Sequence, residues 1–130
     1  MENELMDATL DDLNRRVTEA ILRAERVGTD SDERRSLYRT VSEIEQQISQ
    51  ITTPESVDGG VARVGAVTAA LDAGDWLRAS WLAESYLADA PADLEEELRA
   101  LIVEVDRAAS NVPEPLVYPV GVDLEALRAL

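Results

Sequence analysis

Carboxylates are the side chains of this sequence most suited to chemistry. They occur in runs at Asp11-Asp12, at Asp30-Asp32-Glu33 and at Glu95-Glu96-Glu97. Paired carboxylates can serve as general acid and base or bind a divalent cation. Adjacent helical positions point to different sides, however, and the loop opened by Asp30 has Val41 where an EF-hand needs Glu. We therefore expect no catalytic residues and no metal site.

The composition excludes most other reaction types. The chain has 130 residues, of which 27 are acidic and 12 basic, and it contains neither Cys nor His. Every basic residue is arginine, so the usual zinc, copper and haem ligands, a histidine-activated nucleophile and a lysine Schiff base are all missing. The glycines of Asp58-Gly59-Gly60 are not followed by the Lys and Ser or Thr of a phosphate-binding loop. The sequence predicts a protein that is not an enzyme and uses no cofactor.

The net charge of −15 bears on partners and location. Phosphate backbones and anionic lipid surfaces should repel such a chain. No apolar run of about 18 residues occurs, and the acidic start Met-Glu-Asn-Glu does not resemble a secretion signal. We expect a protein partner or self-association, with no nucleic acid and no membrane. The expected location is cytoplasmic, or the virion if the protein is viral.

The same composition resembles haloarchaeal proteins and proteins of halophilic viruses. The shared features are strong acidity, the absence of Lys and Phe, and many Ala, Val, Asp and Thr residues. At molar salt the Debye length falls to about 3 Å, so repulsion among the excess charges is largely screened. Codon bias in a GC-rich genome is the alternative explanation.

The strongest periodic signal predicts two long helices that form an antiparallel hairpin over residues 5–51. Apolar residues follow one another in steps of four and three, the spacing of a narrow helical seam. The short turn near Gly28 has N-cap residues after it. The seams consist of Met6, Leu10, Leu13, Val17, Ala20, Ala24 and Val27, then Leu37, Val41, Ile44, Ile48 and Ile51.

Shorter helices are expected at about 58–73, 75–90 and 93–109. Thr53-Pro54 resembles an N-cap with a first-turn proline, and residues 52–60 form a linker or a broken helix. Gly74 should end one helix and Asp75 should cap the next, while Asp93 and Glu96 have capping-box spacing. The prediction is an all-α fold with one helical domain over residues 1–110.

Residues 60–109 resemble a single tetratricopeptide-like helical hairpin with its capping helix. The matching residues are Gly74-Asp75-Trp76 at the turn, Ala79 and Ala83 at the helix contact, and Pro91 at the end of the second helix. Arg63, Ala66, Val67 and Ala70 stand where the family has Trp, Leu, Gly and Tyr, and Ala83 replaces its Phe. The resemblance implies protein binding, and no peptide-clamp residue carries over.

Two segments are candidates for protein binding. Trp81 cannot share a narrow seam with Trp76, so it is either buried between helical layers or exposed as an interface anchor. Residues 111–130 form a proline-containing, apolar arm that we expect to be extended and to end in a short helix. It docks either on its own chain or on a neighbour. The candidate binding residues are Trp81, Leu116, Val117, Tyr118, Val120, Leu124 and Leu127.

The sequence thus favours a non-enzymatic structural or assembly subunit. It would bind copies of itself or a larger complex through the arm and one helical face. The outline resembles, in architecture, the small adaptor subunits of tailed-virus head-to-tail junctions. The alternative is a tetratricopeptide-like adaptor or regulator that binds a client protein beside Trp81.

Overall fold

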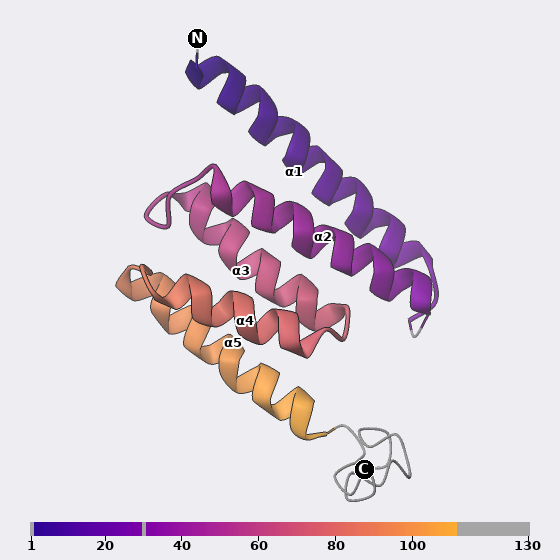
Figure 1. Ribbon diagram of the computed structural model, residues 1–130. Helices are drawn as coiled ribbons and strands as arrows, with labels where there is room; N and C mark the ends of the chain where they lie inside the picture. Colours follow the sequence, from indigo (N-terminus) through magenta and orange to yellow (C-terminus); the bar gives the residue numbers. More distant parts are fainter. Residues whose placement is uncertain (1, 30, 112–130) are drawn as a thin grey trace, which may run out of the picture.

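The computed structural model describes residues 2–29 and 31–111 (Figure 1). In these residues the chain is all-helical, as predicted from the sequence. The predicted arm after Asn111 lies outside the described residues, so its conformation stays a prediction. The helices are α1 (Glu2–Arg26), α2 (Asp32–Gln50), α3 (Val57–Asp72), α4 (Trp76–Leu87) and α5 (Ala92–Ser110).

The helices follow one another across the molecule in chain order and alternate in direction (Figure 1). The second helix packs against α1 and α3, and the fourth packs against α3 and α5. Helix α5 also contacts α3. Since α3 touches three other helices, it is the element on which most of the bundle is assembled.

The core is built largely from small residues. Ala66 and Ala70 of α3 meet Ala79 and Ala83 of α4, and all four are fully buried. Alanine at these positions lets the two helix backbones approach closely at interior packing density. A second cluster joins α1, α2 and α3 through Leu13, Ile44, Ile48 and Ala62. The seam of α1 is less covered near its start, where Met6 is 48% exposed.

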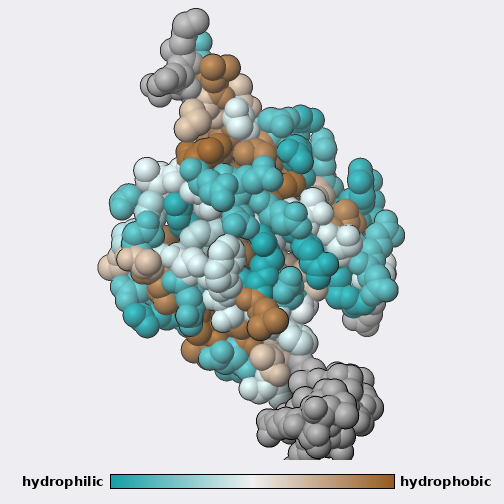
Figure 2. All heavy atoms as spheres, in the orientation of Figure 1, coloured by the Kyte–Doolittle hydropathy of each residue, from teal (hydrophilic) through white to brown (hydrophobic). Residues whose placement is uncertain are grey.

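The outer surface is mostly polar. Figure 2 shows hydrophilic residues over most of one face and a hydrophobic group towards the beginning of α1, where Leu5 is exposed. A surface with many charges and few large apolar patches is expected for a strongly acidic chain.

Some predicted helix starts are confirmed and two are wrong. Asp75 caps α4 by accepting a hydrogen bond from the Arg78 N–H at 3.1 Å. Gly74 ends the preceding helix with a φ of 73°, a conformation that favours glycine. The predicted cap at Thr53 is wrong because Ser56 caps α3 instead, and the capping box at Asp93 is wrong because the N-cap of α5 is Pro91, two residues earlier.

The turn before α3 explains the first of these errors. The Ser56 N–H donates to the Thr53 carbonyl at 3.2 Å, which closes a turn, and the Ser56 hydroxyl then accepts from the Gly59 N–H. Gly59 and Gly60 therefore lie inside α3 and do not break it. A Cβ atom at Gly59 would overlap the Thr53 carbonyl oxygen, so this close approach requires glycine.

Arginine side chains connect the helices. Arg34 donates to the Ala24 carbonyl of α1 at 3.2 Å and lies over the Tyr38 ring. Arg78 of α4 reaches α2, where it donates to the Ser42 hydroxyl at 2.9 Å. Because a guanidinium has a planar set of five donors, one side chain can bridge several acceptors, which an ammonium does less well.

Arg63 is the most buried of these connections, with 7% of its surface exposed. Its guanidinium donates to the carbonyls of Ser49, Thr52 and Gly59 at 2.9, 3.1 and 2.9 Å. It also lies 5.6 Å from the centre of the Tyr86 ring. One side chain thus ties the end of α2 and the following loop to α3 and α4.

We predict that Arg63→Ala lowers the free energy of unfolding by about 3–5 kcal/mol, because three carbonyls lose the guanidinium donor and two of these hydrogen bonds are buried. Arg63→Lys should recover less than half of this loss, since an ammonium cannot match the planar fork. Denaturant unfolding measures both. Arg99→Ala, which removes an exposed pair with Glu95, is the control and should change stability by less than about 0.5 kcal/mol. A similar small effect at Arg63 would contradict the prediction.

Candidate functional site

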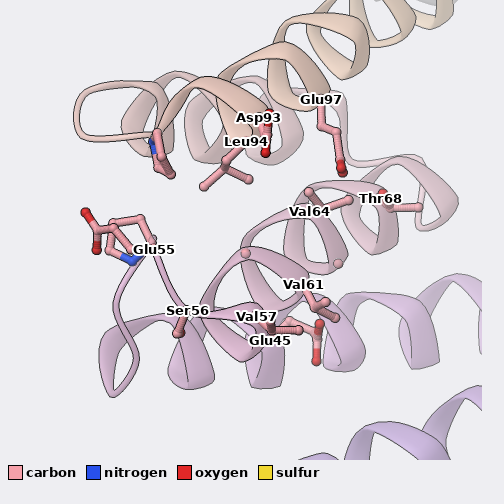
Figure 3. Close-up of a pocket in the computed structure, with 14 residues that line it drawn as sticks. Glu45, Glu55, Ser56, Val57, Val61, Val64, Thr68, Asp93, Leu94 and Glu97 are labelled. Atoms are coloured by element: carbon pink, nitrogen blue, oxygen red, sulfur yellow. The ribbon is translucent and has the colours of Figure 1, made fainter.

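A groove of about 720 Å³ lies between α3 and the beginning of α5, and α2 closes one side of it. Figure 3 shows Leu94, Asp93 and Glu97 of α5 facing Val64 and Thr68 of α3 across this space. The turn before α3 forms the end wall. Its volume is within the range of cavities that hold ligands or the side chains of a bound peptide.

The floor of the groove is apolar. Val57, Val61 and Val64 follow α3 at helical spacing, and Leu94 together with Pro91 covers the opposite side. Val57 is 81% exposed and Val61 is 64% exposed, which is unusual for valine on a helix. Val57 and Val61 therefore form an exposed apolar stripe on α3, and Val64 joins this stripe to the buried cluster that packs on α4.

The rim of the groove is acidic. Glu55, Asp93 and Glu97 surround the opening, and Glu45 lies on the α2 side (Figure 3). Among the described residues, no arginine lines it. The negative potential of the rim favours a positively charged ligand.

Glu45 differs from the other carboxylates of the groove because it is buried, with 7% of the residue exposed. Burial raises the pKa of Glu45 from 4.5 to about 7. Among the described residues no basic side chain forms an ion pair with it. Glu45 is therefore a poorly solvated carboxyl that has no counter-ion among the described residues and that retains its proton to higher pH than an exposed glutamate.

Gly65 provides the space for this carboxylate. A Cβ atom on Gly65 would overlap the Oε2 atom of Glu45. Both residues also border a smaller hollow of about 150 Å³ between α1, α2 and α3. Asp72 borders that hollow as well, and burial raises its pKa although Arg34 opposes the shift.

Trp81 lies on the side of α4 that faces away from the core, 57% exposed, beside Leu77 at 87%. Of the two alternatives that the sequence left open, the exposed position is the observed one. Trp76 instead packs against the central cluster. Trp81 does not line the groove, so the sequence-based candidate and the groove are separate surfaces.

The other candidate residues of the sequence analysis lie outside the described residues, and their role in binding stays a prediction. They are Leu116, Val117, Tyr118, Val120, Leu124 and Leu127.

The groove residues were missed, although the sequence contains a signal for them. Val57, Val61, Val64 and Thr68 recur in steps of four, three and four, a second stripe on a helix whose buried stripe includes Ala66 and Ala70.

In comparisons with protein families, with curated proteins and with solved structures, nothing matches this chain. Within residues 2–29 and 31–111, no helix is both long and apolar enough to cross a bilayer. The same part of the chain contains no group of three or more potential ligand side chains arranged to hold a metal ion. The functional proposal therefore rests on the geometry of the groove.

We predict that Glu45 makes the protein less stable as the pH rises from about 4.5 to about 7. In this range the folded protein retains a proton that the unfolded chain has released, so the free energy of unfolding falls with rising pH. Glu45→Gln removes this component and should be more stable than the wild type by about 1–2 kcal/mol at pH 8. Denaturant unfolding across the pH range measures it. Glu43→Gln, an exposed change on the same helix, is the control, and parallel profiles for all three proteins would contradict the prediction.

Proposed function

We propose that this protein is a non-enzymatic adaptor or assembly subunit that holds an apolar, basic segment of a partner protein in the groove between α3 and α5. The observation that carries the proposal is a groove with an apolar floor and an acidic rim, which no basic residue in the described part of the chain lines. This combination matches an amphipathic helix whose apolar side chains enter a groove while its basic side chains meet the rim.

The exposed valines support a macromolecular partner. Val57 and Val61 line the groove but remain largely exposed, so they lose contact with water only when something broad covers them. Burial of apolar surface contributes about 25 cal/mol per Å², so covering this stripe favours binding. A partner segment can cover the stripe and fill the groove at the same time.

Charge complementarity supports a basic partner. A second copy of this chain carries a net charge of −15 and should be repelled by the acidic rim. Residues 112–130 of the same chain are also a poor match, because Glu114, Asp123 and Glu125 outnumber the single Arg128. A separate protein with basic residues is therefore the occupant that we propose.

A second candidate function is self-assembly through α4 and the C-terminal residues. The exposed pair Leu77 and Trp81 favours it, because large apolar side chains at neighbouring turns of a helix are typical of interfaces. Residues 60–109 resemble a tetratricopeptide hairpin, the predicted outline resembles tailed-virus adaptor subunits, and the composition resembles halophilic proteins. We include these resemblances in the two proposed functions. They support contact with other proteins and do not distinguish the two surfaces.

The groove predicts a defined outcome for peptide selection. A displayed library of random 16-residue peptides, panned on the full-length protein, should enrich amphipathic sequences with apolar residues at helical spacing and at least one Arg or Lys. Gly60→Trp should abolish their binding, because a side chain at Gly60 meets only open space and enters the groove. Ala100→Trp, an exposed change outside the groove, should bind like the wild type.

Two outcomes would contradict the groove as a partner site. One is selection of peptides that bind Gly60→Trp as well as the wild type. The other is peptide binding only to a chain that ends at Asn111, which would assign the groove to the chain's own C-terminal residues. Circular dichroism checks that each variant keeps its helices.

Self-assembly predicts that changing the proposed contact residues lowers the mass of the particles in solution. If the second candidate is correct, light scattering in molar KCl should show oligomers of the full-length chain. Trp81→Ala or a chain ending at Asn111 should then shift the population to monomers, because each loses buried apolar area at the interface. Leu22→Ala, which alters an exposed apolar residue of α1, is the control. Monomers of the unaltered chain would exclude this candidate.

A further inference from the structure

The buried carboxylate of Glu45 is the feature of the groove that the proposed function does not yet explain. An acidic rim alone would attract a basic segment through exposed charges. Glu45 is different because it is 7% exposed, lines the groove and has no ion pair among the described residues. A buried charge without a partner is costly, and the carboxyl avoids this cost either by taking up a proton or by meeting a counter-ion.

Among the described residues that line the groove and the smaller hollow, none can act as the counter-ion of Glu45, so we assign that role to a ligand. On the groove side it is near Val61, Gly65 and Thr68 of α3, and the charged groups across the groove are Asp93 and Glu97. On the other side, the charged or titratable groups bordering the smaller hollow are Tyr38 and Asp72. Within residues 2–29 and 31–111 no arginine lines either hollow, so none of the lining residues described there can supply the positive charge.

The space occupied by the Glu45 carboxylate exists because α3 has a glycine at position 65. Alanine at this position would favour the helix by about 1 kcal/mol but would overlap the Glu45 carboxylate. The glycine therefore allows the carboxylate to lie against the backbone of α3 at the edge of the groove. Within a mostly apolar cavity, one such group can select for a single cationic side chain.

We propose that Glu45 is the counter-ion for one guanidinium or ammonium group that the partner segment inserts into the groove between α3 and α5. This inference rests on the proposed function and specifies it: the partner is recognised by an Arg or Lys next to apolar residues. Glu55, Asp93 and Glu97 steer the segment from the rim, while Glu45 selects the inserted side chain.

The cation site can be tested without a peptide. Hexylguanidinium chloride and its neutral analogue hexylurea are titrated into the full-length protein and followed by NMR at the Glu45 carboxyl carbon and the Gly65 amide. Hexylguanidinium should give saturable shifts at both positions and lower the pKa of Glu45, whereas hexylurea should not. Glu45→Gln should lose the Gly65 response. Equal responses to both compounds, or none, would overturn the assignment of Glu45.

The partner side chain is tested with the tightest peptide from the display selection. Glu45→Gln should weaken its binding at least about tenfold, and changing one particular Arg or Lys of the peptide to Gln should do the same. Both changes together should cost little more than either alone, because they remove one interaction. Gly65→Ala should also weaken binding since it displaces the carboxylate, whereas Gly28→Ala and Glu43→Gln, outside the groove, should not.

The salt dependence of binding distinguishes the contribution of the buried Glu45 pair from that of the exposed carboxylates of the rim. Exposed charge pairs are screened between about 0.3 M and about 2 M KCl, whereas a buried pair is screened much less. The loss caused by Glu45→Gln should therefore persist at high salt, and the smaller loss caused by Glu97→Gln should disappear.

The failures of the two proposals are distinguishable. Peptides that bind the groove without coupling to Glu45 would overturn this inference and leave the proposed function standing. A response to hexylguanidinium with no peptide enriched over Gly60→Trp would identify a site for a small amphiphilic cation. That result would overturn both the proposed function and the assignment of the cation to a partner protein.

Discussion

The arrangement of helices around the groove depends on the buried guanidinium of Arg63. It binds carbonyls at the end of α2 and in α3, and it stacks on Tyr86 of α4. The turn that it holds also forms the end wall of the groove. A single charged side chain therefore determines both the helix packing and the shape of the candidate site. It does so in a chain whose other strong charges are mostly acidic.

Helix α3 packs in the core with one face and lines the groove with the opposite face. One face carries small residues such as Ala66 and Ala70, which allow close packing on α4. The other presents Val57 and Val61 to the groove, where they remain exposed. A helix that is apolar on both sides is normally buried on both sides. The uncovered face of α3 is the feature on which the proposed partner site depends.

The sequence predicted the helical class and the turn at Gly74 and Asp75, because these depend on local spacing and on local hydrogen bonds. It did not predict the groove, because the exposure of Val57 and Val61 depends on how α5 packs beside α3. The burial of Glu45 likewise depends on the packing of α2 on α3, which the spacing of residues along α2 does not determine.

The pairing of Gly65 with Glu45 has a consequence for how such a chain can diverge. A change of Gly65 to a larger residue displaces the Glu45 carboxylate from its present position, and loss of the carboxylate removes the reason for a glycine within a helix. If the proposed cation site is under selection, descendants of this sequence should keep both residues or replace both.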